Sequence, residues 1–160
     1  MSHAFDNAFQ RLLSVEGGLS DITEDNGGLT KYGISQRSYP QVDIANLTED
    51  QAKAIYQSDF WDALKLDQVL DSSVASAIFD TAVNFGQSRA KRIIQGIAGV
   101  TVDGIIGPKT LAAINSATAP IFIAMLVLSR IEHRVDVCLH DPSQKTFIIG
   151  WLRRDLDLLS

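Results

Sequence analysis

Acidic residues that could act as a catalytic pair lie close together near the N-terminus. Glu16, Asp21, Glu24 and Asp25 fall within one short segment, residues 15–35, which is otherwise rich in glycine and hydroxyl side chains. Glycoside hydrolysis uses two carboxyl groups in unlike surroundings: one protonates the leaving oxygen, and the other activates water or stabilises an oxocarbenium ion. This cluster therefore makes glycoside hydrolysis the first chemistry to consider.

Glu16 stands at the end of a predicted helix. Gly17 and Gly18 follow it, as is typical of a helix C-terminus, and Glu16 lies four residues after Leu12 on the same face. We expect this carboxyl group to be half-buried at the negative end of the helix dipole. Both conditions raise the pKa of a carboxyl group, which suits a general acid. The apolar stripe of this helix is formed by Phe5, Ala8, Phe9, Leu12 and Leu13.

The polar residues after Glu16 have the composition of a short β-hairpin. The turn-forming run Asn26-Gly27-Gly28 leads into residues 29–32, LTKY. We expect the hairpin to fold back over the helix end, so that an ionised Asp25 faces Glu16. Thr30 and Tyr32 would then offer hydroxyl groups to a water molecule or a sugar. Glycine-rich acidic turns are also common as solvated loops, so this pattern alone leaves both interpretations open.

The segment EGGLSDITEDNGGLTKYGIS, residues 16–35, resembles the signature of glycoside hydrolase family 108. This family comprises N-acetylmuramidases found as phage endolysins and as bacterial secretion-associated muramidases. The spacing of Glu16, Asp25 and Thr30 is also similar to the Glu, Asp, Thr constellation of phage-type lysozymes, where the last gap is commonly one residue longer. The resemblance therefore implies Glu16 as the catalytic acid more directly than it implies a role for Thr30.

A second predicted helix ends near a tryptophan that could either line a groove or pack in the core. Thr48 and Gln51 form a capping box for a helix that runs to about Trp61. The Trp61 indole could line a sugar-binding groove. Packing in the core is the favoured alternative for this residue, since most tryptophan side chains are largely buried.

A central helix is predicted from Ser72 or Ser73 to Gly86. Its sequence, VASAIFDTAVNFG, resembles the FDTAVN stretch of the same muramidase family. Asn84 could donate a hydrogen bond to an N-acetyl group of the substrate. Alternatively, Asp80 and Asn84 could tie adjacent helices together, which is equally expected for Asn84 and favoured for Asp80.

The C-terminal half is predicted to be helical and to complete the core. The segment VDGIIGPKT, residues 102–110, has a turn followed by Pro108 at a helix start, and it resembles the DGxxGPxT signature of predicted peptidoglycan-binding segments. The ending FIIGWLRRDLDLL resembles the C-terminal half of the same family. We therefore expect a catalytic lobe over residues 1–88 and a helical lobe over residues 89–160, both sharing one core.

Composition limits the partners of the chain. With 160 residues, 46% apolar residues and a net charge of -5, the chain suits one compact protein and not a nucleic-acid-binding surface. The single cysteine excludes an internal disulfide, and no secretory signal or continuous membrane span is expected; the apolar run at residues 121–128 predicts a buried helix. No cofactor is expected, and no metal site, because the histidines are widely separated: His3, His133 and His140.

The sequence predicts a mainly α, lysozyme-like protein with a short β-hairpin beside the catalytic helix end. The expected activity is that of an N-acetylmuramidase, with Glu16 as the general acid, Asp25 as the base or electrostatic partner, and Thr30 positioning water. Asp21 and Glu24 remain alternatives to Asp25. The alternative functions are a lytic transglycosylase and a non-catalytic wall-binding or secretion-helper protein. A monomer made in the bacterial cytoplasm would need a holin-like pore or another export route to reach peptidoglycan.

Overall fold

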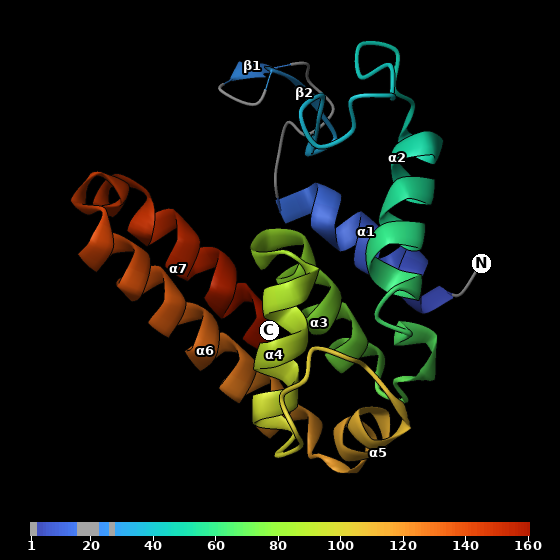
Figure 1. Cartoon of the computed structure of the whole chain (residues 1–160), viewed down its shortest axis with the longest axis vertical. Coiled ribbons are helices and arrows are strands. Elements are labelled where there is room, and N and C mark those ends of the chain that lie inside the picture. Colours follow the sequence, from blue (N-terminus) through green and yellow to red (C-terminus); the bar gives the residue numbers. More distant parts are fainter. Residues whose placement is uncertain (1–2, 16–22, 26–27) are drawn as a thin grey trace. The chain divides into compact units, whose positions relative to one another are not determined.

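The computed structural model describes residues 3–15, 23–25 and 28–160, with side chains described for residues 3–14 and 28–160. The chain forms two compact units, Met1–Ala63 and Leu64–Ser160 (Figure 1). Helices make up most of the second unit and are the main elements of the first, and the strands of the described residues form one small sheet. The mainly α class expected from the sequence is therefore confirmed.

The first unit contains the predicted hairpin. Strands β1 and β2 pair in antiparallel fashion, and β2 pairs in the same way with a third strand, β3, that the sequence analysis did not anticipate. Tyr32 and Gly33, which connect β2 to β3, both have positive φ angles, 53° and 74°, as in the tight turns that join neighbouring strands. The elements of this unit are α1 (His3–Val15), β1 (Thr23–Asp25), β2 (Gly28–Lys31), β3 (Ile34–Ser35), α2 (Glu49–Tyr56) and the π-helix η1 (Gln57–Asp62).

Aromatic side chains of α1 pack against α2 and η1. The rings of Phe9 and Tyr56 lie 5.8 Å apart, and those of Phe5 and Trp61 lie 5.4 Å apart. The apolar stripe predicted for the first helix is thus the buried face of α1, where Phe5, Ala8, Phe9 and Leu12 are all buried. The Lys53 ammonium lies 2.6 Å from an Asp6 carboxylate oxygen and joins the two helices at their surface.

The start of α2 has the capping box predicted from the sequence. The Thr48 hydroxyl accepts a hydrogen bond from the Gln51 amide, and the Gln51 side chain accepts one from the Thr48 amide. Two backbone donors that the helix itself cannot pair are thereby satisfied. The helix was expected to run to about Trp61; α2 ends at Tyr56, and the π-helix η1 continues it through Trp61.

The second unit is built around α3, which packs against α4 and α6. Asp71 caps the N-terminus of α3 by accepting hydrogen bonds from the Ser73 and Val74 amides at 2.9 and 3.1 Å. Gly86, with φ 79°, ends α3 as predicted and leads directly into α4. The elements of this unit are η2 (Leu66–Gln68), α3 (Ser72–Phe85), α4 (Gln87–Ile97), α5 (Pro108–Ser116), α6 (Ala119–His140), η3 (Pro142–Phe147), α7 (Ile148–Leu156) and η4 (Asp157–Leu159).

The long helix α6 is only partly buried over its most apolar stretch, contrary to the prediction of a buried helix at residues 121–128. Phe122 and Leu126 face the core, whereas Ile121 is 64% exposed. The reason is that α3, α4 and α7 cover one face of α6 and leave the opposite face open. Taken singly, none of the described helices is long and apolar enough to span a membrane; α5 and α6 pass that test together, with a bend of 112° between them.

Candidate functional site

The structure places the predicted catalytic residues only in part. Glu16 and Asp21 lie outside the described residues, and Glu16 directly follows Val15, the last residue of α1. Asp25 is the last residue of β1, where only its backbone is described. The expected approach of Asp25 to Glu16 therefore stays a prediction.

The register of the hairpin sorts the acidic positions by face. Thr23 pairs with Thr30, Glu24 with Leu29, and Asp25 with Gly28. Because successive positions of a strand alternate between the two faces, positions 23 and 25 share a face with position 30, and position 24 belongs to the opposite face. The hairpin thus groups the positions of Asp25 and Thr30, and separates them from that of Glu24.

The predicted hydroxyl residues of the hairpin are both described. The Thr30 hydroxyl donates a long hydrogen bond of 3.4 Å to the Gly28 carbonyl oxygen. Tyr32 is half-buried, its ring lies 5.6 Å from the Lys31 ammonium, and its carbonyl oxygen accepts a hydrogen bond of 2.9 Å from the Tyr56 hydroxyl. This last bond anchors the end of β2 to α2, so the hairpin is held by the helix that packs on α1.

Trp61 occupies the core of the first unit. Its side chain is 0% exposed and packs against Phe5. An indole with no exposed surface cannot stack on a sugar in this structure. The core-packing interpretation, which the sequence favoured for Trp61, is therefore the one the structure matches.

A hydrogen-bonded carboxylate in the first unit was missed by sequence reasoning. Asp59, in the π-helix η1, accepts hydrogen bonds from the Tyr39 hydroxyl at 2.7 Å and from the Ser58 hydroxyl at 3.0 Å. Burial, and then the hydrogen bond to Asp59, raise the pKa of Tyr39, so its hydroxyl stays protonated and keeps donating. π-Helical turns are frequent at functional sites, but no sequence spacing signals a contact between residues this far apart.

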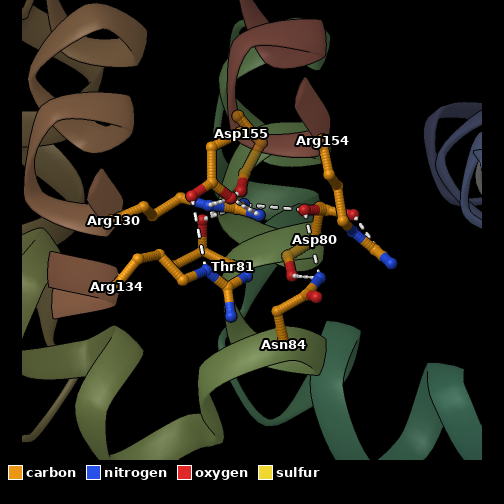
Figure 2. A network of polar contacts seen from close by, with 8 residues as sticks. Asp80, Thr81, Asn84, Arg130, Arg134, Arg154 and Asp155 are labelled. Carbon is orange, nitrogen blue, oxygen red and sulfur yellow. Dashed lines mark hydrogen bonds and ion pairs between the residues drawn. The ribbon is translucent and has the colours of Figure 1, made fainter. Parts of the chain in front are cut away.

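Asn84 belongs to a polar network in the second unit (Figure 2). Its amide nitrogen donates hydrogen bonds to the backbone carbonyl oxygen of Asp80 at 2.8 Å and to the Asp80 carboxylate at 3.2 Å. The two Asp80 carboxylate oxygens also bind Arg130 Nη1 at 2.6 Å and Arg154 Nη2 at 3.0 Å. Asp80 thus ties α3 to α6 and α7, which is the structural role that the sequence favoured for it.

Arg130 is the centre of this network. Its guanidinium is fully buried and contacts Asp155 through Nε at 2.8 Å and Nη2 at 2.7 Å, while Nη1 also reaches the Thr81 hydroxyl at 3.1 Å. The Arg134 guanidinium lies between two aromatic rings, 4.4 Å from the centre of Phe85 and 4.9 Å from that of Trp151. Burial lowers the pKa of Arg134 and Asp155 opposes that effect. These contacts make the cluster a structural tie between α3, α6 and α7.

Comparison with known proteins assigns the two halves of the chain. Residues 9–86 match the model of the family described as Glycosyl hydrolase 108. These residues, just under half of the chain, form a glycosyl hydrolase 108 domain. Residues 89–156 match a second family, described as Predicted Peptidoglycan domain, so both resemblances noted in the sequence are confirmed. Together they identify a peptidoglycan hydrolase of the lysozyme type, with peptidoglycan as its partner at the cell wall.

The fold of this protein is similar to that of a solved structure, SagA of Brucella abortus. The two chains are 27% identical and superpose with a TM-score of 0.75, over 97% of this chain and 95% of that chain. The lysozyme-like, mainly α fold expected from the sequence is thereby confirmed. None of the curated proteins compared with this chain matches it.

The boundary between the two matched families falls inside the second compact unit. The family 108 match ends at residue 86, after α3, whereas the compact units divide between Ala63 and Leu64. Helix α3 therefore belongs to the glycosyl hydrolase by sequence and packs with helices of the peptidoglycan domain. Among the described residues, no group of three or more acidic, histidine or cysteine side chains is arranged to hold a metal ion.

Proposed function

We propose that this protein is an N-acetylmuramidase that hydrolyses the β-1,4 bond between N-acetylmuramic acid and N-acetylglucosamine. Glu16 acts as the general acid, because the family resemblance carries the catalytic acid to this position and the end of α1 precedes it. Asp25 activates water or stabilises the oxocarbenium ion, and Thr30 positions the water. The Tyr32 hydroxyl contacts the glycan.

The register of the hairpin carries the choice of Asp25. Pairing of Thr23 with Thr30 gives positions 25 and 30 a common face, which a carboxylate that activates water and a hydroxyl group that positions it need in order to act on one molecule. Glu24 pairs with Leu29 and occupies a position on the other face. The register therefore favours Asp25 over Glu24 as the second carboxylate.

Substitutions at three acidic positions test this assignment. Glu16→Gln should lower wall hydrolysis by roughly 10²-fold or more while the fold is kept, which is the usual contribution of a positioned acid. Asp25→Asn should cause a loss of the same order. Glu24→Gln is the matched control on the opposite face and should keep wild-type activity. The assay is release of reducing ends from purified peptidoglycan, with circular dichroism to verify folding.

Mass analysis of the products separates this function from the alternatives. A muramidase leaves reducing N-acetylmuramic acid ends, whereas a lytic transglycosylase leaves 1,6-anhydro ends and a binding protein leaves none. Anhydro ends, or a folded Glu16→Gln variant with near-normal activity, would contradict the proposal. Equal losses in the Asp25 and Glu24 variants would remove the argument from the hairpin register.

A further inference from the structure

A basic pocket lies in the second unit where α3 ends and α4 begins. The cavity has a volume of about 580 Å³, within the size range of pockets that bind small organic groups. It is lined by Phe85, Gly86, Ser88, Arg89 and Arg92. Two guanidinium groups, a hydroxyl group and an aromatic ring therefore face a common space, and none of them has a part in the proposed catalytic machinery.

The arginines of the pocket are not neutralised by the described part of the chain. Within residues 3–14 and 28–160, no carboxylate lies at ion-pair distance from Arg89 or Arg92. Arg89 Nη1 instead contacts the ring of His133, 2.7 Å from Nε2. By contrast, the arginines of α6 that approach Phe85 are paired with Asp80 and Asp155. Both guanidinium groups of the pocket therefore keep an uncompensated positive charge within the described residues.

The positive charge of Arg89 also acts on His133, whose ring it contacts. Burial first, and then the positive charges of Arg89 and Arg134, lower the pKa of this imidazole, and Asp136 opposes them only weakly as the last contributor. The chain as a whole has a net charge of -5, so this local charge is not a general property of its surface.

The chemistry of the lining fits a carboxylate attached to an apolar stem. A guanidinium can bind a carboxylate through two parallel hydrogen bonds, Ser88 can donate a third, and the ring of Phe85 offers an apolar wall. Peptidoglycan carries such groups on its stem peptides, whose amino-acid side chains and termini end in carboxylates. We propose that this pocket binds a carboxylate of the peptidoglycan stem peptide.

The inference rests on the proposed function, in which peptidoglycan is the substrate, and it adds a recognition site away from the scissile bond. Arg92 is the residue that tests it best, because its side chain is exposed and has no described ion-pair partner. Arg153 on α7 is the matched control: it is also exposed, does not line the pocket, and loses the same charge on substitution.

The experiment measures binding of a disaccharide-peptide by titration calorimetry of the full-length protein. In a GlcNAc-MurNAc-peptide the C1 of N-acetylmuramic acid, at which a muramidase cleaves, carries no further sugar. Binding is therefore observed without turnover. Arg92→Gln should weaken binding by about tenfold, the effect of losing one charge-assisted hydrogen-bonded contact. Arg153→Gln should leave the affinity unchanged. Amidating the peptide carboxylates should weaken binding to the wild type by a similar factor and abolish the difference between wild type and Arg92→Gln.

Equal affinities of the wild type, Arg92→Gln and Arg153→Gln for the free-acid peptide would overturn the inference. Binding of poly(glycerol phosphate) that depends on Arg92, with no such dependence for the peptide, would also overturn it and assign the pocket to a phosphate polymer. Reducing-end release from glycan strands stripped of peptides gives an independent check on catalysis. The wild type and Arg92→Gln should cleave the stripped strands equally. If the protein binds the peptide but releases no reducing ends, only the muramidase assignment is refuted.

Discussion

Replacing the buried Arg130 by methionine should destabilise the second unit by about 3–5 kcal/mol, the usual cost of leaving a buried charge without its partner. Both partners of Arg130 would be affected, but unequally. Asp155 is 0% exposed and would keep only Arg134, whose Nε lies 3.4 Å away. Asp80 would keep Arg154 at 3.0 Å and is partly exposed, with 14% of its side chain accessible. Most of the loss should therefore come from Asp155.

Urea unfolding followed by circular dichroism measures this loss, and a double variant tests its cause. Arg130→Met combined with Asp155→Leu removes both members of the fully buried ion pair, so it should be more stable than Arg130→Met alone. The single loss of 3–5 kcal/mol would be a large part of the roughly 5–15 kcal/mol that stabilises a typical protein. A loss below about 1 kcal/mol, or a double variant less stable than the single one, would refute the view that unpaired charge dominates here.

Three further results are expected. Asp71→Ala should lower the free energy of unfolding by about 1 kcal/mol, because α3 loses its N-cap. Asp71→Asn should keep most of this stabilisation, because asparagine is also a good N-cap residue. Equal losses for the two variants in urea titrations would contradict this. His133 has a pKa lowered from 6.5, so the unfolded chain takes up its proton first as the pH falls; its contribution to stability should be complete above about pH 6.5 and decline below it. Arg89→Gln should raise that pKa in an NMR titration, and an unchanged value would contradict the assigned cause. Truncation after Ser88 should yield an aggregating product, because α3 loses α4 and α6; a soluble, cooperatively melting fragment that cleaves peptidoglycan would contradict this and favour separable lobes at residue 88.

Local signals in the sequence predicted many of the element boundaries. The capping box at Thr48 and Gln51, the end of α3 at Gly86 and the start of α5 at Pro108 all depend on residues within one turn of each other. The antiparallel pairing of β1 with β2 likewise follows from a turn signal between them. Such interactions can be recognised in one sequence because backbone geometry fixes the spacing of the partners.

Contacts between distant segments could not be predicted in the same way. Arg130 forms ion pairs with Asp155 on α7 and Asp80 on α3, and no sequence periodicity links these positions. The third strand also escaped prediction, because its turn uses Tyr32 at a positive φ angle, which a tyrosine seldom adopts. For Trp61 the sequence favoured core packing without excluding a groove, because a tryptophan near a helix end has the same sequence context whether it is buried or exposed.

The candidate site was predicted more from family resemblance than from physical pattern. Spacing alone suggested a carboxylate pair but could not choose among Asp21, Glu24 and Asp25. The hairpin register supplies a physical reason to prefer Asp25 over Glu24, since alternation along β1 separates their positions. Asp80 illustrates the opposite case, because a tie between adjacent helices was the role that the sequence favoured for it, and its carboxylate contacts arginines of α6 and α7.

The position of Asp80 restricts how the C-terminal half of this chain could be exchanged for that of another protein. A recombination event at the family boundary, between residues 86 and 89, would transfer α6 and α7 while leaving Asp80 behind on α3. The hybrid would fold well only if the incoming half placed guanidinium groups opposite Asp80, as Arg130 and Arg154 do here. A crossover before α3, near Ala63 and Leu64, would instead move the helix together with its partners. Protein engineers who build chimaeric hydrolases from this scaffold should therefore join the chains at that earlier junction.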